Sequence, residues 1–504
     1  MPTDPYAQGL KLSAQGQHLK AIERFEQALA LKADDTRILF ALGNTARALG
    51  MSGSAEEFYR RVLSLEPERL EALVNLANLL RAQGQFATAI ALLQPALARN
   101  PQAPELWLTL GSAYRETGDA ERARDHYRQA LQRRPDYAAA LGNLADLAAD
   151  DGETEEALAL YGRALKAEPD NAQLRLNRAV LLLLMGDLKE GWRDYSARLK
   201  LAGKVPVPDH GLPCWSGGPL KRTRLLVTAE QGVGDQIMFV GMIPGVAERA
   251  AAQGGSVILE CEPRLAPLFA RSFPSVAVHP WDIETRAGVI HARYGWLKAA
   301  GGANAAIELG TLGRFLRKSI EDFPKVDSYL RPDAAEAGRW RSFFADAPRP
   351  LIGLCWRSGS VGGQRALHYA PLEAWAAFVR TLPGSIVCAQ YDASDAEIAA
   401  LNRMSGRDIL VPSAIDQKNE LDRTAAMLST FDAVASAPTA VSWLAAASGV
   451  ITCKILYDTS WTSFGQAYEP FAPRALCMMP RTRGDWADAF AQAETAIKSR
   501  FAAP

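Results

Sequence analysis

The sequence predicts a chain of two parts, an all-α superhelix of repeated helix pairs followed by an α/β region with two Rossmann-like halves. Two observations predict this. Prolines recur every 34 residues through the first two-fifths of the 504-residue chain. Beyond a Pro- and Gly-rich stretch at 202–220, which we interpret as a linker, short β-rich runs alternate with helical patterns.

Residues of four kinds define the repeat. Its prolines are Pro67, Pro101, Pro135 and Pro169, and its small residues are Ala55, Ala89, Ala123 and Ala157. Its bulky residues are Tyr59, Leu93, Tyr127 and Tyr161, and its glycines are Gly50, Gly84, Gly118, Gly152 and Gly186. This is the tetratricopeptide pattern, in which small residues let two helices approach, aromatic residues wedge between units and proline closes the second helix. With a weaker first repeat and a sixth, we expect six repeats over residues 1–201.

Such an array forms a superhelix whose concave groove binds extended peptides. The groove-facing position of successive repeats holds Ala41, Asn75, Thr109, Asn143 and Asn177. An Asn amide can pair with both the N–H and the C=O of a peptide backbone. We therefore predict peptide binding by Asn75, Thr109, Asn143 and Asn177, the alternative being that they occupy a solvated helix face. The array resembles that of O-GlcNAc transferases, whose asparagine ladder holds protein substrates.

Composition excludes several classes of function. Lys plus Arg and Asp plus Glu both number 56, so the chain lacks the excess of cations needed to wrap nucleic acid or coat an anionic membrane. None of the six cysteines forms a CxxC pair, so we expect neither a zinc knuckle nor a dithiol site, but reduced, mostly buried thiols. With no secretory pattern at its start and no apolar run long enough to span a bilayer, we expect a cytoplasmic protein.

The α/β region is expected to divide into halves at 221–344 and 345–504. In the first half we expect strands at 225–228, 256–260 and 276–279 and a helix at 244–252. In the second we expect strands at 351–356, 386–390, 409–411, 433–436 and 451–456, with helices at 371–381, 395–404, 420–430, 440–448 and 485–499. Ligands bind such sheets where strand ends meet helix starts, so the cleft between the halves is the expected site.

The first candidate motif is Glu230-Gln-Gly-Val-Gly-Asp235, directly after the 225–228 strand. Gly232 and Gly234 permit a tight turn and close backbone approach, and with Gln231 they form the expected acceptor loop. A carboxylate at the mouth of an α/β cleft is a reasonable general base for a hydroxyl acceptor, which is the role predicted for Asp235. The alternative is that Asp235 only complements the helix dipole.

The second motif follows the 351–356 strand and supplies the predicted donor site. It places two permanent cations, Arg357 and Arg365, a hydroxyl, Ser358, and an imidazole, His368, in one loop that also contains Gly359. Arg offers a planar fork of donors, so this loop suits a nucleotide phosphate or the carboxylate of an acidic sugar. The alternative is a solvated basic loop. No Asp-x-Asp pair lies near the cleft loops, so we expect no metal and no resident cofactor.

The third motif, beginning Ser436-Ala-Pro-Thr, ends the 433–436 strand. Thr439 is expected to cap the next helix, whose first N–H groups face the donor. Four aromatic residues near the cleft are expected to pack in the core rather than stack on a base: Trp461, Phe464, Tyr468 and Phe471.

The stretch LLVTAEQGVGDQIMFVGMIPGV resembles the opening of the second module of bacterial tetratricopeptide–glycosyltransferase proteins, which are similar to the heptosyltransferases. That resemblance implies the GT-B fold, with acceptor in the first half and nucleotide-sugar in the second, and makes Asp235 the catalytic aspartate. The sequence departs from the heptosyltransferase pattern at Pro438, where that family has Asp, and at Trp443, where it has His. These departures argue against an ADP-heptose donor, and they raise the question of whether the site is active.

The motifs together resemble the flagellin glycosyltransferases of alphaproteobacteria. This resemblance implies an inverting, metal-independent protein O-glycosyltransferase, with flagellin docked on the repeats. The implied donor is a CMP-linked nonulosonic acid such as pseudaminic acid, whose phosphate and carboxylate would meet Arg357 and Arg365. Two alternatives stay open: a non-catalytic adaptor or chaperone with a vestigial α/β module, and an enzyme acting on a glycan or lipid-linked sugar.

Overall fold

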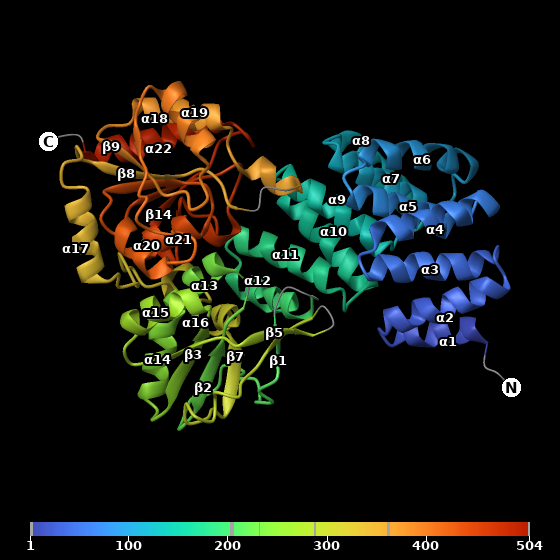
Figure 1. The fold of residues 1–504 in the computed structure, drawn as a ribbon, viewed down its shortest axis with the longest axis horizontal. Helices are drawn as coiled ribbons and strands as arrows, with labels where there is room; N and C mark the ends of the chain where they lie inside the picture. Colours follow the sequence, from blue (N-terminus) through green and yellow to red (C-terminus); the bar gives the residue numbers. More distant parts are fainter. Residues whose placement is uncertain (1–3, 202–205, 231, 287–288, 360–362, 502–504) are drawn as a thin grey trace. The chain divides into compact units, whose positions relative to one another are not determined.

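The computed structural model describes residues 4–201, 206–230, 232–286, 289–359 and 363–501. Contacts between residues divide the chain into two compact units, Met1–Leu174 and Arg175–Pro504 (Figure 1). Among the described residues, no helix has the length and apolar character needed to cross a membrane. All six cysteines are free thiols, and all except Cys214 are buried.

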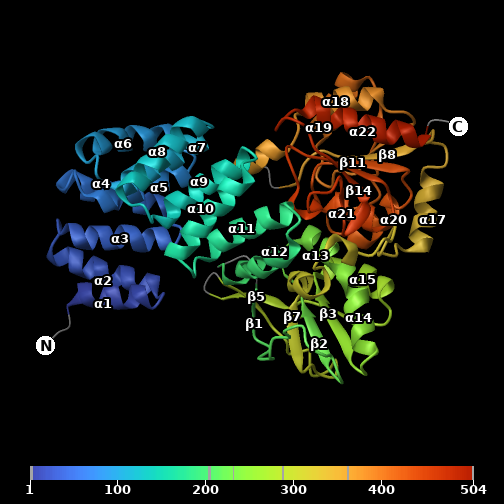
Figure 2. The same cartoon turned by 180° about the vertical axis from the view of Figure 1, so that it is seen from behind.

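The first unit is a helical superhelix built from consecutive helix pairs (Figure 2). The first three pairs are α1 (Pro5–Ala14) with α2 (His18–Leu31), α3 (Thr36–Ala48) with α4 (Ser52–Leu65), and α5 (Leu70–Ala82) with α6 (Phe86–Arg99). The next two are α7 (Pro104–Glu116) with α8 (Ala120–Arg133), and α9 (Ala138–Asp150) with α10 (Thr154–Ala167). Helix α11 (Ala172–Leu184) begins in this unit and continues into the second.

The repeat pattern is confirmed position by position. Each periodic proline lies two residues beyond the end of a second helix, and the periodic alanines are fully buried. The periodic glycines have positive φ, 73° at Gly50, and Gly16 marks the same turn in the first repeat with φ 72°. The tyrosines, however, pack inside their own repeat and not between units as expected, since a Cβ placed on Gly43 of the same repeat would lie 2.7 Å from the ring of Tyr59. Glycine thus leaves room for the ring.

The sixth helix pair packs as part of the second unit. It consists of α11, α12 (Leu188–Tyr195) and the short helix η1 (Ser196–Lys200). Trp192 is 2% exposed and meets Phe239 and Phe464 edge to face, at centroid distances of 6.3 and 5.7 Å. The repeat pattern continues to 201, whereas the contacts divide the chain at Leu174, because the apolar face of this last pair is buried against the α/β core.

The first sheet of the second unit has four parallel strands in the order β4-β3-β2-β7. Its strands are β2 (Arg224–Thr228), β3 (Ser256–Cys261), β4 (Ala277–Pro280) and β7 (Ala305–Glu308). Its helices are α13 (Val233–Phe239), η2 (Val240–Met242), α14 (Ile243–Ala251), η3 (Pro263–Leu265), α15 (Ala266–Ser272), η4 (Leu309–Leu312), α16 (Gly313–Leu316) and η5 (Ile320–Asp322). No strand was expected after β4 in this half, yet β7 completes the sheet, and β5 (Ile283–Arg286) and β6 (Val289–Ala292) form a small sheet with β1 (Val207–Pro208).

After α17 (Ala334–Phe343), a seven-stranded sheet follows in the order β10-β9-β8-β11-β12-β14-β13. Its strands are β8 (Leu351–Cys355), β9 (Ser385–Cys388), β10 (Ile409–Leu410), β11 (Ala433–Ser436), β12 (Thr452–Ile455), β13 (Tyr468–Glu469) and β14 (Ala472–Met478). All neighbours are parallel except β13 and β14. From β10 to β14 the order is that of a doubly wound sheet, which reverses between β8 and β11.

Helices cover both faces of this sheet (Figure 2). They are α18 (Leu372–Thr381), α19 (Asp395–Ser405), α20 (Leu421–Leu428), α21 (Ala440–Ala447) and α22 (Trp486–Phe501), and the connecting loops contain the short helices η6 (Gly363–His368) and η7 (Trp461–Ser463). Trp375 of α18 and Phe490 of α22 pack in one core cluster, whereas α20 and α21 contribute to another. Every strand and helix expected at residues 221–504 is present within a few residues of its expected bounds, so the α/β alternation is confirmed.

Candidate functional site

A pocket of about 240 Å³ lies where the loops at the ends of several strands meet. Asp235 and Met238 of α13 line it from the first sheet, and His368 of η6 lines it from the second. Its other lining residues lie between β11 and η7: Pro438, Trp443, Lys454, Leu456, Tyr457, Asp458, Thr459, Ser460, Trp461 and Thr462. The pocket therefore sits at carboxyl ends of parallel strands, as expected for a ligand site in α/β sheets.

Asp235 is held in the first turn of α13 by its own loop. The N–H of Gly232, which precedes the helix, donates to Oδ2 of Asp235 at 3.2 Å. A Cβ on Gly234 would lie 3.5 Å from Cα of Ala440, so the starts of α13 and α21 lie side by side. Gly232 has φ −84°, so it provides close approach rather than a left-handed turn. Gln231 lies outside the described residues.

A buried ion pair fixes the loop from behind. Nε of Arg198, in η1, donates to Oε2 of Glu230 at 2.8 Å, and the N–H of Gly310 donates to Oε1 at 2.7 Å. Both side chains of the ion pair are at most 2% exposed. Burial alone would lower the pKa of Arg198, but the Glu230 carboxylate raises it above its usual value, which keeps the guanidinium charged. The segment that ends the repeats therefore anchors the motif that carries Asp235.

Lys454 is a pocket residue that the sequence analysis missed. It lies in β12 and is 2% exposed, and its ammonium bonds to the buried carboxylate of Glu469. Its Nζ lies 4.6 Å from the ring centroid of Trp443. Ser460 also donates to Glu469, at 3.1 Å. A lysine inside the apolar strand Ile-Thr-Cys-Lys-Ile-Leu was the available signal, because lysine is almost never fully buried without a partner.

The structure does not bring Arg357 to this pocket. Its guanidinium is bound between Glu397 of α19 and Asp392, with Nε to Oε1 of Glu397 at 2.7 Å and Nη1 to both oxygens of Asp392 at 2.9 Å. Arg357 lowers the pKa of Glu397 to about 2, so the pair stays ionised near neutral pH. Because all its donors are engaged within the protein, Arg357 positions the loop after β8 instead of offering a fork to a donor sugar.

Of the other residues predicted for the donor site, His368 lines the pocket, whereas Ser358 and Gly359 make contacts within the loop after β8. His368 lines the pocket, with its ring 5.5 Å from the ring of Tyr457 and nearly perpendicular to it. Ser358 accepts a 2.7 Å hydrogen bond from the hydroxyl of Tyr369, and the N–H of Gly359 donates to the hydroxyl of Tyr391. The side chain of Arg365 lies outside the described part of the chain.

Thr439 is 7% exposed and turns its hydroxyl into the protein. Its Oγ1 lies 3.5 Å from Sγ of Cys355 and 3.3 Å from Oγ of Ser436, and its N–H donates to Ser442 at the start of α21. The adjacent Pro438 lines the pocket instead. Thr439 therefore shapes the turn before α21, and its buried hydroxyl is not a pocket group.

Of the four aromatic residues expected in the core, Phe464 and Phe471 are buried there, at 1% and 5% exposure. Trp461 lines the pocket and also packs on Tyr195, with a centroid distance of 5.2 Å. In the described ranges, no three His, Cys, Asp or Glu side chains gather into a group that could hold a metal ion.

The predicted peptide contacts take part in links between neighbouring repeats. Nδ2 of Asn75 donates to Oδ1 of Asn44 at 2.9 Å, and Nδ2 of Asn143 donates to Oγ of Ser112 at 3.2 Å. Both asparagines are half-buried, as is Asn177. Thr109 was wrongly predicted as a contact, because it is 4% exposed and its hydroxyl donates to the backbone O of Glu105 at 2.8 Å.

Comparison with known proteins supports the repeats directly. Residues 6–69 and 74–138 match one tetratricopeptide repeat family, and residues 148–191 match another. Protein FlbA of Caulobacter vibrioides (strain ATCC 19089 / CIP 103742 / CB 15) is 33% identical over 326 residues, covering 64% of this chain and 54% of that protein. This chain thus spans about half of its relative's length. The matched stretch is longer than the repeat array, so it includes part of the α/β unit.

Several solved structures are similar over about a third of the chain. The thermophilic tetratricopeptide protein TTC0263 of Thermus thermophilus is 29% identical, covering 36% of this chain and 97% of that one, with a TM-score of 0.32. MamA is 24% identical, and the match covers 33% of this chain and 96% of MamA, with a TM-score of 0.29. YrrB, described as having an unusual peptide-binding site, is 21% identical, and the match covers 34% of this chain and 87% of YrrB, with a TM-score of 0.27.

Proposed function

We propose that the protein is a metal-independent GT-B glycosyltransferase that moves a sugar from a nucleotide-sugar to Ser or Thr of a protein held by the tetratricopeptide repeats. The acceptor is flagellin and the sugar a nonulosonic acid. One observation carries this proposal: a single pocket holds a carboxylate from the first α/β half, Asp235 of α13, and a cation from the second, Lys454 of β12. Acceptor activation and leaving-group stabilisation require these two kinds of group.

In this mechanism Asp235 accepts the proton of the acceptor hydroxyl. The hydroxyl oxygen then attacks the anomeric carbon, and the bond from that carbon to the phosphate oxygen breaks. The nucleotide leaves with the electron pair, so negative charge develops on its phosphate. Lys454, together with the N–H groups that open α21, stabilises this charge.

The N–H donors left free at the pocket suit a donor with one phosphate. Because Arg357 is bound by two carboxylates, Lys454 is the buried cation that lines the pocket in the described chain. An ammonium has three N–H donors, and its bond to Glu469 uses one of them. A CMP-linked sugar presents a single phosphate, which the two remaining N–H donors of Lys454 and the N–H groups that open α21 can hold.

A thermal-shift panel with CMP, UDP, ADP and GDP tests the proposal. Ligand at 100 times its dissociation constant adds about 2.7 kcal/mol to the free energy of unfolding, so CMP is expected to raise the melting temperature. The double variant Lys454→Met/Glu469→Met removes both buried charges and should fold but lose the shift. Exposed Lys498→Met is the control and should keep it. An unchanged CMP shift in the double variant would contradict the assigned role of Lys454.

The second candidate function is a non-catalytic adaptor that binds its protein partner through the repeats. The volume of the pocket favours it, because 240 Å³ is below the roughly 300–1,000 Å³ of typical small-molecule sites. Failure of every nucleotide to shift the melting temperature, with and without flagellin, while flagellin still binds, would favour the adaptor.

A further inference from the structure

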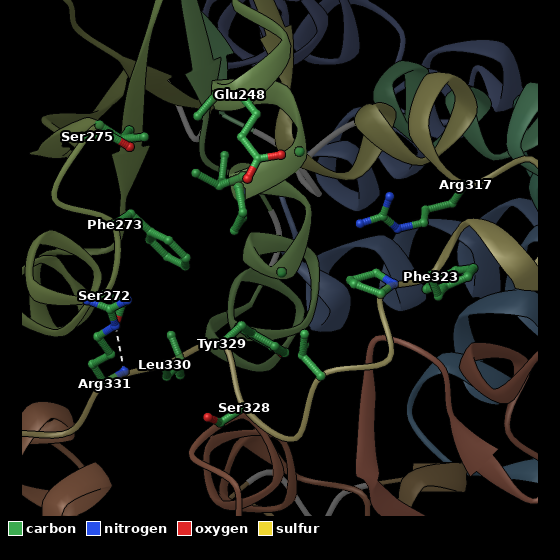
Figure 3. A pocket seen from close by; sticks show the side chains of 18 of the residues that line it. Glu248, Ser272, Phe273, Ser275, Arg317, Phe323, Ser328, Tyr329, Leu330 and Arg331 are labelled. Carbon is green, nitrogen blue, oxygen red and sulfur yellow. Dashed lines mark hydrogen bonds between the residues drawn. The ribbon is translucent and has the colours of Figure 1, made fainter. Parts of the chain in front are cut away.

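A second, larger cavity of about 840 Å³ lies in the first α/β half (Figure 3). Its walls are η2 and α14, the loop between α15 and β4, and the segment 317–331. It shares no lining residue with the pocket around Asp235. Apolar side chains form much of its surface, among them Phe273, Val276, Phe323, Tyr329 and Leu330.

Arg317 is a buried cation in the wall of this cavity. The residue is 7% exposed and follows directly after α16. Its Nη1 donates to the backbone O of Leu316 at 2.9 Å, but its buried Nε has no hydrogen-bond partner. The guanidinium carbon lies 5.3 Å from the ring centroid of Phe323. Figure 3 shows the side chain extending inward from one wall.

The carboxylates nearby leave this charge without an ion pair. Oδ2 of Asp322 accepts from the backbone N–H groups of Lys318 and Ser319, at 2.8 and 3.0 Å. Glu321 and Glu248 are exposed, and neither forms an ion pair with Arg317 within the described chain. Burial lowers the pKa of Arg317, which the Asp322 charge only partly offsets. An unpaired buried charge is costly, and in native proteins such a group calls for an explanation.

We propose that this cavity binds a small organic anion. Its carboxylate or phosphate pairs with the guanidinium of Arg317, and its apolar or ring-shaped part packs against Phe273, Phe323 and Tyr329. The volume falls within the usual range of roughly 300–1,000 Å³ for small-molecule sites, and an apolar wall with one fixed charge is their typical composition. An oxyanion would supply the partner that the buried guanidinium lacks.

One residue that lines the cavity is hydrogen-bonded to the helix that carries Asp235. The hydroxyl of Tyr329 donates to the backbone O of Ile237 in α13 at 2.8 Å. A ligand packed on Tyr329 would therefore stabilise the position of α13. The proposal itself does not depend on glycosyl transfer, and its test measures binding alone.

Isothermal titration calorimetry of the full-length protein tests the site with four probes: phenyl phosphate, benzoate, inorganic phosphate and benzyl alcohol. Phenyl phosphate or benzoate should bind at least tenfold more tightly than benzyl alcohol, and the better of the two identifies the preferred oxyanion. Arg317→Met should weaken that binding at least tenfold. Arg314→Met is the matched control, because Arg314 is an exposed arginine of α16 that does not line the cavity, and it should bind like the wild type.

A second variant separates ligand binding from folding. Ser275 is exposed and lines the cavity, so Ser275→Trp fills part of the space without disturbing the core, and it should weaken binding at least fivefold. Arg317→Met should melt no lower than the wild type, because it removes an unpaired buried charge. The proposal is overturned if no anion binds the wild type at millimolar concentration. It is equally overturned if binding persists unchanged in both Arg317→Met and Ser275→Trp.

Discussion

Glu260 lies behind the motif that carries Asp235, and replacing it with Gln should change how stability depends on pH. Glu260 is 1% exposed, and its Oε2 accepts from the N–H of Ala229 and the hydroxyl of Tyr294, both at 3.0 Å. Its Oε1 is buried without a partner. Burial raises the pKa of Glu260 from 4.5 to about 7, although both hydrogen bonds act to lower it.

Because the pKa of Glu260 is raised on folding, this group makes the protein less stable as pH rises. Below pH 4.5 the carboxyl is protonated in both states and adds no pH dependence. Between pH 4.5 and 7 the unfolded chain releases its proton while the folded chain retains it, so the free energy of unfolding falls as pH rises. At 1.36 kcal/mol per pKa unit, this amounts to about 2–3 kcal/mol between pH 5 and pH 8.

Glu260→Gln removes the titration, so its free energy of unfolding, relative to wild type, should rise by about 2–3 kcal/mol from pH 5 to pH 8. Urea unfolding followed by tryptophan fluorescence at both pH values measures this difference. Tyr294→Phe is the opposing control: it removes a hydrogen bond that favours the carboxylate, so stability should fall more steeply with pH. A difference between Glu260→Gln and wild type that stays constant from pH 5 to pH 8 would refute the raised pKa.

Two further predictions concern the anchoring ion pair and the repeats. Arg198→Met leaves Glu230 buried and unpaired, so the free energy of unfolding measured in urea should fall by about 3–5 kcal/mol. The double variant Arg198→Met/Glu230→Gln should recover most of this loss. Equal losses in the single and the double variant would contradict the pairing. Gly43→Ala places a Cβ 2.7 Å from the ring of Tyr59 and should cost about 1–3 kcal/mol in thermal unfolding followed by circular dichroism. The control is Gly53→Ala, whose added Cβ meets no atom within 4 Å in an exposed stretch of α4. It should stabilise the folded protein by roughly 0.5–1 kcal/mol. Equal effects of the two substitutions would refute the packing of Tyr59 on Gly43.

The repeats could be predicted almost completely because their signal is local and periodic. Turn glycines, closing prolines and buried alanines each recur at a fixed interval, and each has a local physical cause. The positive φ of Gly50 and the buried position of Ala55 follow from that pattern alone. The 34-residue period does not show which helix pair packs against the α/β core in place of another repeat. Trp192 lies in the last helix of the repeat pattern but is buried among residues of the α/β core, and no local feature predicts that.

The candidate site was predicted only in part, because its charges pair over long sequence distances. Asp235 and His368 line the same pocket, as the loop positions suggested. Arg357 does not, because its partners Asp392 and Glu397 lie on another strand end and another helix, and a sequence does not show which carboxylates an arginine will meet. Lys454 was missed because the strand around it is apolar.

Intact-mass measurement of flagellin is a direct test of glycosyl transfer by this protein, because it requires no knowledge of the donor. The gene for this protein is deleted, and the strain is complemented with either the wild-type gene or the Asp235→Asn variant. Flagellin is then purified from both strains. The wild type should add mass to flagellin in sugar-sized steps, and Asp235→Asn, present at equal level and still binding flagellin, should add about 10²–10⁴-fold less. Flagellin of equal mass in both strains, whether modified or unmodified, would exclude Asp235-dependent transfer to flagellin by this protein.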